Sequence, residues 1–307
     1  MQASLSAVID SALRAALAER FDFESSELGL VALRRDARAA LDAVRFTLDS
    51  DGAAVPSELG GRNALLALSS GADEFLLRRF THGGLLRWLT GRRFLDPERP
   101  FVEALLSEQL AAAGIATPQV VAARAVRAGA GAWKLDLVTR RVTGGIDLAA
   151  ELERTDARAR RAGLLAAFGA WLRRLHDTGF LHADLHPKNV LVTHGGPRAT
   201  AFELWVLDLD RSVLRRELGA RERTGNLARL VRYVWRRRQR LGLRAHDLAR
   251  VLAAYEPRRD VRREVWRAVA ERTRSTLLLH RAGWWLESRA RGAQPMGDGP
   301  ASSVTRG

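Results

Sequence analysis

The sequence predicts an α+β fold of two lobes, a small strand-rich lobe followed by a larger helical lobe. Short β-rich runs are concentrated in the first half of the chain, whereas apolar residues at helical spacing dominate the second half. The segment VTGGIDL, at 142–148, lies where the pattern changes. We therefore expect a strand-rich lobe at 55–143 and a helical lobe at 144–288, with a ligand site in the cleft between them.

The strand-rich lobe is expected to contain a strand, a helix and a strand in that order. The runs EFLLRRF at 74–80 and WKLDLVT at 133–139 are short and rich in apolar or β-branched residues, as strands are. Between them, Gly114 marks the end of a helix and Pro118 the start of a further strand. The helix itself is indicated by apolar residues on one face, Phe101, Leu105, Leu106 and Leu110.

The helical lobe is predicted from two long amphipathic segments. The first begins at residue 156 and ends near His176, with Leu164, Leu165, Phe168, Trp171, Leu172 and Leu175 on one face. In the second, at 226–241, apolar residues and arginines occupy opposite faces, and the arginines are Arg229, Arg232, Arg236 and Arg240. The runs at 190–192 and 204–208 predict two strands within this lobe.

The two ends of the chain are expected to lie outside this unit. Residues 1–54 are interpreted as an N-terminal extension that is helical in part. Its helix is indicated by one apolar stripe, made of Leu5, Val8, Ile9, Ala12, Leu13, Ala16 and Leu17. Residues 289–307 have almost nothing to bury and are expected to form a disordered tail.

Composition excludes several classes of protein. With 307 residues and 47% apolar content, the chain can bury a real core, which excludes a disordered or fibrous protein. Because it has no cysteine, disulfides, thiolate catalysis and cysteine-based metal sites are excluded. The N-terminus lacks a signal-peptide pattern, and no window approaches the ~18 apolar residues of a membrane span. We therefore expect a cytoplasmic protein.

The segment HADLHPKN, at 182–189, carries the residue types that phosphoryl transfer needs. That reaction requires a carboxylate near the attacking hydroxyl, oxygen ligands for magnesium and cations near the phosphates. Asp184 precedes Asn189 by the spacing found in the catalytic loop of kinases, and His182 stands just ahead of Asp184. We expect these three residues to be catalytic, with Asp184 accepting or orienting the acceptor hydroxyl proton and Asn189 offering its amide oxygen to Mg²⁺.

A second carboxylate for the metal follows at Asp208, the end of the strand-like run LWVLD. A loop, a short strand, a turn and a second strand ending in Asp are more specific together than either aspartate alone. The alternative is that Asp184 and Asp208 cap turns while His182 is a core histidine. Asp210 is either a further metal ligand or the partner of a nearby arginine.

Three motifs together, GFLHADLHPKNVLV, LWVLDLDRS and NLARLVRYV, resemble the lipopolysaccharide kinases, bacterial members of the protein-kinase-like superfamily. The similarity extends upstream through LLRRFTHGGLLRWLTGRRFL and covers roughly residues 55–240, nearest to the kinases of 3-deoxy-D-manno-octulosonic acid (Kdo). This resemblance implies a bilobal protein-kinase-like fold with ATP and Mg²⁺ as cofactors. It further implies transfer of the γ-phosphate to a sugar hydroxyl, of Kdo or heptose, in lipid-linked lipopolysaccharide inner core at the cytoplasmic face of the inner membrane.

The expected ATP site departs from the usual kinase pattern. Kinases place a Lys on the third strand and pair it with a Glu on the following helix, but neither lysine of this chain lies there. The matching residue is Arg78, with Arg79 as the second choice, and its expected partner is Glu103, with Glu108 as the second choice. Arginine keeps the charge but presents a rigid fork in place of a compact ammonium. The alternative for Glu103 is an ordinary solvated helix residue.

The loop that covers the nucleotide is weakly indicated. Gly60, Gly61 and Arg62 precede a strand-like run and are candidate phosphate contacts, although a glycine pair is just as often a plain turn. Lys188 either touches the γ-phosphate or is a solvated loop lysine.

Two alternatives to a lipopolysaccharide acceptor stay open. His186 and Lys188 make DLHPKN similar to the aminoglycoside and choline phosphotransferases, which act on small molecules. Arg78 in place of lysine is the main support for a basic pseudokinase or binding module. A protein substrate is disfavoured, because no long segment with an Ala-Pro-Glu-like anchor follows Asp210.

The charge of the chain bears on its partners. The formal net charge of +15 favours anionic partners over polycationic aminoglycosides, although a GC-rich genome explains an arginine excess equally well. No nucleic-acid partner is expected, because the basic regions lack interleaved aromatics or a recognised motif. The arginine face at 226–241 either contacts anionic membrane headgroups peripherally or is solvated. No feature indicates a particular oligomeric state.

Overall fold

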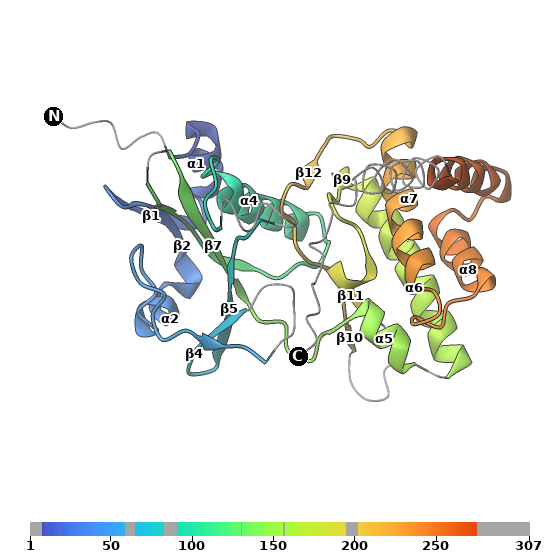
Figure 1. Cartoon of the computed structure of the whole chain (residues 1–307), viewed down its shortest axis with the longest axis horizontal. Helices are drawn as coiled ribbons and strands as arrows, with labels where there is room; N and C mark the ends of the chain where they lie inside the picture. Colours follow the sequence, from blue (N-terminus) through green and yellow to red (C-terminus); the bar gives the residue numbers. More distant parts are fainter. Residues whose placement is uncertain are drawn as a thin grey trace, which may run out of the picture.

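The computed structural model describes residues 8–58, 65–82, 91–129, 131–155, 157–194 and 202–274. Over these residues the chain forms a sheet-based lobe, here the N-lobe, and a mainly helical lobe, here the C-lobe (Figure 1). This confirms the predicted α+β fold class. The candidate phosphate contacts Gly60, Gly61 and Arg62 and the expected tail at 289–307 lie outside the described residues.

The N-lobe is built on an antiparallel sheet with the strand order β1-β2-β6-β7-β5-β4-β3. The two predicted strands are present as β5 and β7, which pair directly and place Arg78 opposite Leu137. The bounds of the strands are β1 Phe21–Ser26, β2 Gly29–Arg34, β3 Val55–Pro56, β4 Leu66–Ser70, β5 Asp73–Arg79, β6 Val120–Arg127 and β7 Trp133–Arg140.

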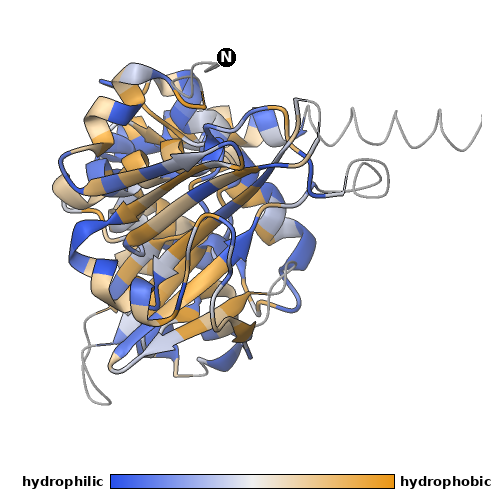
Figure 2. Ribbon diagram, turned by 90° about the vertical axis from the view of Figure 1, so that its left-hand side faces the viewer, coloured by the Kyte–Doolittle hydropathy of each residue, from blue (hydrophilic) through white to orange (hydrophobic). Residues whose placement is uncertain are grey.

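Both faces of β2, the second strand in this order, are buried. Leu30 of β2 belongs to a core shared with Phe101 of α4 (Arg99–Ala112), whereas Val31 belongs to a second core that includes Leu41 of α2 (Arg38–Ala43). A strand covered on both sides lacks the polar alternation of a half-exposed strand, which accounts for the apolar run in β2. Figure 2 shows hydrophobic colouring along the strands of this lobe.

The first part of the chain belongs to the N-lobe and is not a separate extension. Helices α1 (Ser11–Leu17) and α2 fit the expected helical content of 1–54, but β1 and β2 form one edge of the sheet, and β2 pairs with β6. The boundary expected at residue 54 therefore does not coincide with an edge of the sheet. The pairing is non-local, so the local sequence pattern did not indicate it.

Helix α4 lies beside α1 and faces the junction of the two lobes (Figure 1). Its predicted apolar residues Phe101, Leu106 and Leu110 are buried. The helix ends before Gly114, whose φ of 73° is the left-handed conformation typical of a residue just beyond a helix. The predicted helix and its termination at glycine are therefore confirmed.

The C-lobe contains the two predicted amphipathic helices, α6 and α7, packed with further helices and small sheets. Its elements are α5 Leu148–Arg154, α6 Arg158–Asp177, α7 Ala220–Arg237, α8 Ala245–Tyr255, β8 Ile146–Asp147, β9 Phe180–Leu181, β10 Val190–His194, β11 Phe202–Val206, β12 Val213–Leu214 and a 3-10 turn at Pro187–Asn189. Residues 259–274 are also helical. Among the described residues, none of the helices has the length and apolar content needed to span a bilayer.

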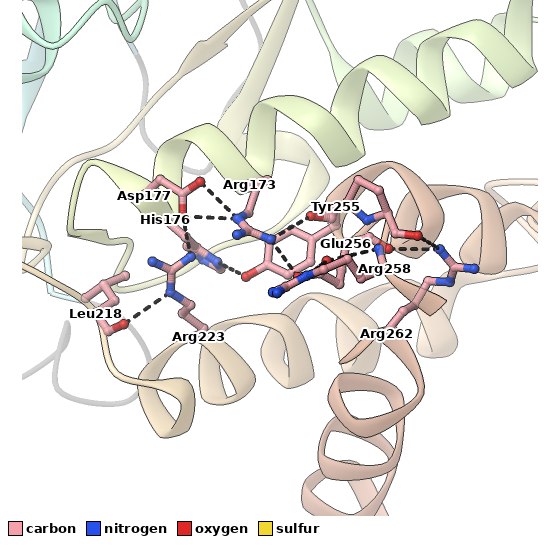
Figure 3. A network of polar contacts seen from close by, with 10 residues as sticks. Arg173, His176, Asp177, Leu218, Arg223, Tyr255, Glu256, Arg258 and Arg262 are labelled. Atoms are coloured by element: carbon pink, nitrogen blue, oxygen red, sulfur yellow. Dashed lines mark hydrogen bonds and ion pairs between the residues drawn. The ribbon is translucent and has the colours of Figure 1, made fainter. Parts of the chain in front are cut away.

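A polar network with a buried centre at His176 and Tyr255 joins α6 to α8 within the C-lobe (Figure 3). Arg173 donates to Asp177 on its own helix at 2.9 Å and to Glu256 just beyond α8 at 2.8 Å. His176, which is fully buried, lies with its Nδ1 2.9 Å from the hydroxyl of Tyr255. The two helices are therefore held by directed bonds as well as by apolar packing.

This network reaches the 182–189 loop through Asn226 of α7. The Oδ1 atom of Asn226 lies 3.2 Å from Nε2 of His176, and its Nδ2 donates to the carbonyl of His182 at 2.7 Å. A ring that donates through Nε2 and accepts a hydroxyl at Nδ1 is a neutral imidazole. Burial, which outweighs the hydrogen bond that His176 donates to Asn226, lowers the pKa of His176 to about 4.

His176 is expected to make the stability of the protein depend on pH. The unfolded chain binds a proton on this histidine near pH 6.5, whereas the folded chain binds it only near pH 4. The contribution of His176 to the free energy of unfolding is therefore complete above pH 6.5 and falls by up to about 3 kcal/mol as the pH is lowered to about 4. Thermal melts across this pH range measure the slope.

The matched pair of variants for this test is His176→Gln and His246→Gln. His246, on α8, has a side chain that is 57% exposed. His176→Gln should flatten the dependence between pH 6.5 and pH 4, while His246→Gln should keep the wild-type slope. An unchanged slope in His176→Gln would contradict the assignment.

Candidate active site

A cleft of about 910 Å³ lies between the two lobes. Its walls combine apolar residues of the N-lobe sheet with polar residues of the C-lobe loops. Six of the residues singled out from the sequence line this one cleft: Arg78, Glu103, Asp184, Lys188, Asn189 and Asp208. The structure therefore brings together residues from β5, α4, the 182–189 loop and the segment after β11.

The 182–189 loop, here the catalytic loop, presents Asp184 to the cleft. The loop leaves the short strand β9 and returns through a 3-10 turn that starts at Pro187, where a fixed φ suits the first turn position. Asn189 closes it, since its Nδ2 donates to the carbonyl of Asp184 at 2.9 Å. The carboxylate of Asp184 is 59% exposed, with Nε2 of His186 at 3.4 Å and Nη1 of Arg229 at 3.9 Å.

His182 holds the catalytic loop and does not face the cleft. It is 1% exposed; its Nε2 donates to the carbonyl of Leu207 at 2.9 Å, and its Nδ1 accepts the backbone N–H of Asp184 at 3.0 Å. Burial lowers the pKa of this histidine, so it is neutral. These contacts fit a positioning role, which ties the backbone of Asp184 to the segment that carries Asp208, better than the catalytic role expected from the sequence.

Asp208 occupies an unusual backbone conformation opposite the catalytic loop. Its φ of 55° is left-handed, a conformation that costs free energy for most residues other than glycine and that often occurs at functional sites. Neighbouring bonds hold it there: the N–H of Leu207 donates to the carbonyl of Asn189 at 2.9 Å, and the N–H of Leu209 donates to Oε1 of Glu103 at 3.2 Å. The carboxylate of Asp208 is 46% exposed toward the cleft.

Arg78 joins the N-lobe to this site. Its guanidinium donates to Glu103 through one nitrogen and to Asp208 through another, the latter at 2.6 Å. Glu103 is only 5% exposed, and burial raises its pKa to about 7 although Arg78 opposes the shift. The expected pairing of Arg78 with Glu103 is thus present, and the alternative of a solvated Glu103 is wrong.

The second choices for this pair contact other partners. Arg79, which points to the opposite face of β5, pairs with Asp51. Glu108 pairs with Arg34 and also with Arg20, the latter at 3.2 Å. Arg78 and Glu103 are therefore the residues that the fold directs into the cleft.

Asp210 is engaged in an ion pair, whereas Lys188 is exposed in the cleft. Both carboxylate oxygens of Asp210 are bonded to Arg99, with Nε at 3.0 Å from Oδ1, which is the pairing alternative considered for this residue. A role of Asp210 as a metal ligand would require release of that pair and stays a prediction. Lys188 is exposed and lines the cleft.

The oxygen atoms offered by the site suit magnesium. Because the amide nitrogen of Asn189 is bonded to Asp184, its Oδ1 is the atom left for a ligand. Together with the carboxylate of Asp208, this gives two oxygen donors in one cleft. Mg²⁺ in kinases is commonly held by one or two such protein groups and completed by phosphate oxygens and water. The residues present therefore fit the metal that the sequence predicts.

An aromatic stack beside Asp184 was missed by sequence reasoning. The ring of His186 stacks on Tyr233 of α7 with centroids 4.6 Å apart, and the guanidinium of Arg237 lies 4.0 Å from the Tyr233 centroid. All three residues line the cleft. The spacing of Tyr233 and Arg237 by one helical turn is the only sequence signal, and a single tyrosine on an amphipathic helix is as often a core residue.

Substitutions at Arg78 are expected to distinguish the effect of its positive charge from the effect of its two hydrogen bonds. Arg78→Ala should lower kcat/KM for ATP by about 100-fold, because the contact expected between Arg78 and the phosphates is lost and Glu103 is left buried and unpaired. Arg78→Lys should stay within about 10-fold of wild type, since an ammonium can replace the charge though not both bonds. Steady-state kinetics with varied ATP measure this.

Arg79 is the control for this series, since it neighbours Arg78 but lies on the other face of β5. Arg79→Lys should leave kcat/KM for ATP within about 2-fold of wild type, because Arg79 contacts Asp51 and not the cleft residues. If Arg79→Lys were the more damaging of the two lysine variants, the choice of Arg78 would be wrong.

The two lobes, the catalytic loop and the pair between β5 and α4 define a phosphotransferase of the protein-kinase-like class. A family profile described as the lipopolysaccharide kinase (Kdo/WaaP) family matches residues 53–255. The chain therefore belongs to this family of sugar phosphotransferases, whose kinase activity on lipopolysaccharide core sugar implies the use of ATP.

Known proteins similar to this chain agree with that assignment. A 3-deoxy-D-manno-octulosonic acid kinase of Actinobacillus succinogenes is 31% identical over 175 residues, 55% of this chain and 68% of the relative. One of Xanthomonas euvesicatoria pv. vesicatoria is 30% identical over 243 residues, 76% of this chain and 92% of the relative. A solved structure of WaaP in complex with acyl carrier protein aligns with a TM-score of 0.50 and 22% identity, over 84% of this chain and 92% of that one. The predicted family and the bilobal fold are confirmed.

Proposed function

We propose that this chain transfers the γ-phosphate of ATP, bound with Mg²⁺, to a hydroxyl of Kdo in the inner core of a lipid-linked lipopolysaccharide. The observation that carries the proposal is the exposed carboxylate of Asp184, which lines the same cleft as Arg78, Glu103 and Asp208. Relatives named as Kdo kinases favour Kdo over heptose as the acceptor sugar. The net charge of +15 favours an anionic acceptor.

The N-lobe side of the cleft is proposed to bind the nucleotide. Leu76, Val120 and Leu137 supply apolar surface on which a flat base can pack. Arg78 is held by Glu103 with its fork directed into the cleft, so it can exchange its bond to Asp208 for one to phosphate oxygens. That exchange frees the carboxylate of Asp208 for the metal.

Asn189 and Asp208 are proposed to hold the magnesium ion through their oxygen atoms. When bound, the ion would neutralise charge that develops on the phosphates during transfer. His182 keeps the two ligands in register, because it bonds both to the catalytic loop and to the carbonyl next to Asp208.

Asp184 is proposed to orient the acceptor hydroxyl and take its proton. Its carboxylate is more than half exposed, and His186 lies near one of its oxygens. The backbone of Asp184 is fixed at its N–H by His182 and at its carbonyl by Asn189. The base is therefore pre-positioned before the acceptor binds.

The cytoplasmic face of the inner membrane is the proposed place of this reaction, with peripheral contact through the C-lobe. Trp235 of α7 and Trp266 are 55% and 42% exposed, and the guanidinium of Arg238 lies over the Trp235 ring. Aromatic and basic side chains together suit an anionic membrane interface. Flotation with vesicles of anionic and of neutral phospholipid tests the contact; equal recovery with both would contradict it.

The function is tested by offering three acceptors with labelled ATP: Kdo-bearing lipid A precursor, a panel of aminoglycosides, and a generic protein. Label is expected only in the lipid, and only when Mg²⁺ is present. Label in an aminoglycoside would replace the proposal with a small-molecule kinase. ATP binding without transfer to any acceptor would favour a pseudokinase.

A further inference from the structure

Helix α7 carries a row of arginines that starts beside the catalytic loop. Gly225, Arg229, Arg232 and Arg236 follow one another at helical spacing and therefore share one face. Arg272, from the helical residues 259–274, joins this row, because its guanidinium packs over Gly225 at 3.4 Å from the position of an added Cβ. We call Arg229, Arg232, Arg236 and Arg272 the basic stripe.

The charges of this stripe repel one another. Burial and the neighbouring Arg229, Arg236 and Arg272 all lower the pKa of Arg232, and no carboxylate among the described residues offsets them. Within the described part of the chain, Arg232 and Arg236 take part in no ion pair, whereas Arg223 and Arg240 are paired with Asp177 and Glu153. Like charges at helical spacing destabilise a helix. A bound anion removes that repulsion.

The stripe is connected to the proposed base. Arg229 donates to the carbonyl of Ala183, and its Nη1 lies 3.9 Å from Oδ1 of Asp184. The adjacent face of α7 carries Tyr233 and Arg237, which line the cleft. From Arg229 to Arg236 the stripe runs along about 10 Å of helix. An acceptor whose hydroxyl reaches Asp184 can therefore extend along the stripe.

We propose that the basic stripe binds anionic oxygens of the acceptor, its phosphates or carboxylates outside the reacting sugar hydroxyl, and thereby directs that hydroxyl to Asp184. Guanidinium forks match phosphate and carboxylate oxygens in two-bond geometry, so a row of them recognises a molecule with several separated anionic groups. This inference rests on the proposed function and adds the part of the acceptor that is recognised. Arg232 and Arg236 then determine acceptor affinity and do not take part in phosphoryl transfer.

The test uses Arg232→Gln, Arg236→Gln and the double variant in the full chain, with Arg127→Gln as control. Arg127 is exposed, lies at the end of β6 in the N-lobe and contacts Trp133. With Kdo-bearing lipid A precursor in neutral detergent micelles, the double variant should raise the acceptor KM about 10-fold or more. Its kcat and its KM for ATP should stay within about 2-fold of wild type, and so should all three constants of Arg127→Gln.

Two further arms identify the source of the anionic groups. A precursor chemically stripped of its phosphates should bind wild type as weakly as the intact precursor binds the double variant. If the defect of the double variant appeared only with vesicles of anionic phospholipid and not in neutral micelles, the stripe would recognise bilayer headgroups and the proposal would fail. The melting temperature of the double variant should equal or exceed that of wild type, because repulsion is relieved.

The outcomes separate this inference from the proposed function. Transfer by wild type with an unchanged acceptor KM in the double variant would overturn the role of the stripe alone. Absence of transfer to the lipid by wild type would overturn the proposed function, and the stripe proposal with it.

Discussion

Replacing Asp184 with asparagine is expected to lower the turnover number by about 100-fold or more while leaving ATP binding nearly unchanged. Removal of a positioned general base has an effect of this size. Asparagine keeps the shape of the side chain, and the backbone bonds of Asp184 to His182 and Asn189 do not involve its carboxylate. The fold of the loop should therefore persist. Single-turnover transfer to Kdo-bearing lipid, beside equilibrium binding of ATP, measures the two quantities separately.

Asp42→Asn is the matched control for this experiment. Asp42 is about as exposed as Asp184 and pairs with Arg38 on α2, in the N-lobe. Asp42 does not line the cleft, so its substitution should not change turnover. If Asp184→Asn retained the wild-type rate, Asp184 would not be the base, and the proton would have to leave by another route.

The catalytic loop was predictable because its chemistry is contiguous in sequence. Asp184 and Asn189 are separated by a short, fixed spacing, and the fold of that segment depends on bonds within it, such as the one from Asn189 to the carbonyl of Asp184. Arg78 and Glu103 were also found, since each follows from the order of strand and helix. In these cases local pattern and chain order suffice.

Other features depend on contacts between distant segments and left no local signal. β2 belongs to the sheet because it pairs with β6, and its burial on both faces removes the alternation that identifies many strands. Asp210 could have faced a metal or an arginine, and its ion pair with Arg99 depends on where α4 packs, which no local pattern gives. Tyr233 enters the site through its stack with His186, which no spacing rule predicts.

Asp208→Asn is expected to reduce turnover by about 100-fold or more and to abolish the effect of Mg²⁺ on ATP binding. A metal ion that neutralises charge on the transferring phosphate stabilises the transition state by several kcal/mol, and loss of the Asp208 carboxylate would remove a group that holds this ion. Asparagine is the informative substitution, because it tolerates the left-handed φ of 55° better than most residues and keeps one oxygen while losing the charge. The glutamate partner of Arg78 is unaffected, so the arginine keeps one of its two bonds.

The measurement is the rise in melting temperature caused by ATP with and without Mg²⁺, since a ligand that binds only the folded state stabilises it by mass action. ATP should raise the melting temperature of wild type more when Mg²⁺ is present. For Asp208→Asn, the rise caused by ATP should be the same with and without Mg²⁺. Asp210→Asn decides between the two interpretations of Asp210. If Asp210 only pairs with Arg99, this variant keeps the metal effect and loses stability; if the metal effect disappears, Asp210 is a ligand. Retention of the metal effect in Asp208→Asn would remove Asp208 from the metal site, and the contact between Arg78 and Asp208 would then be a permanent link between the lobes.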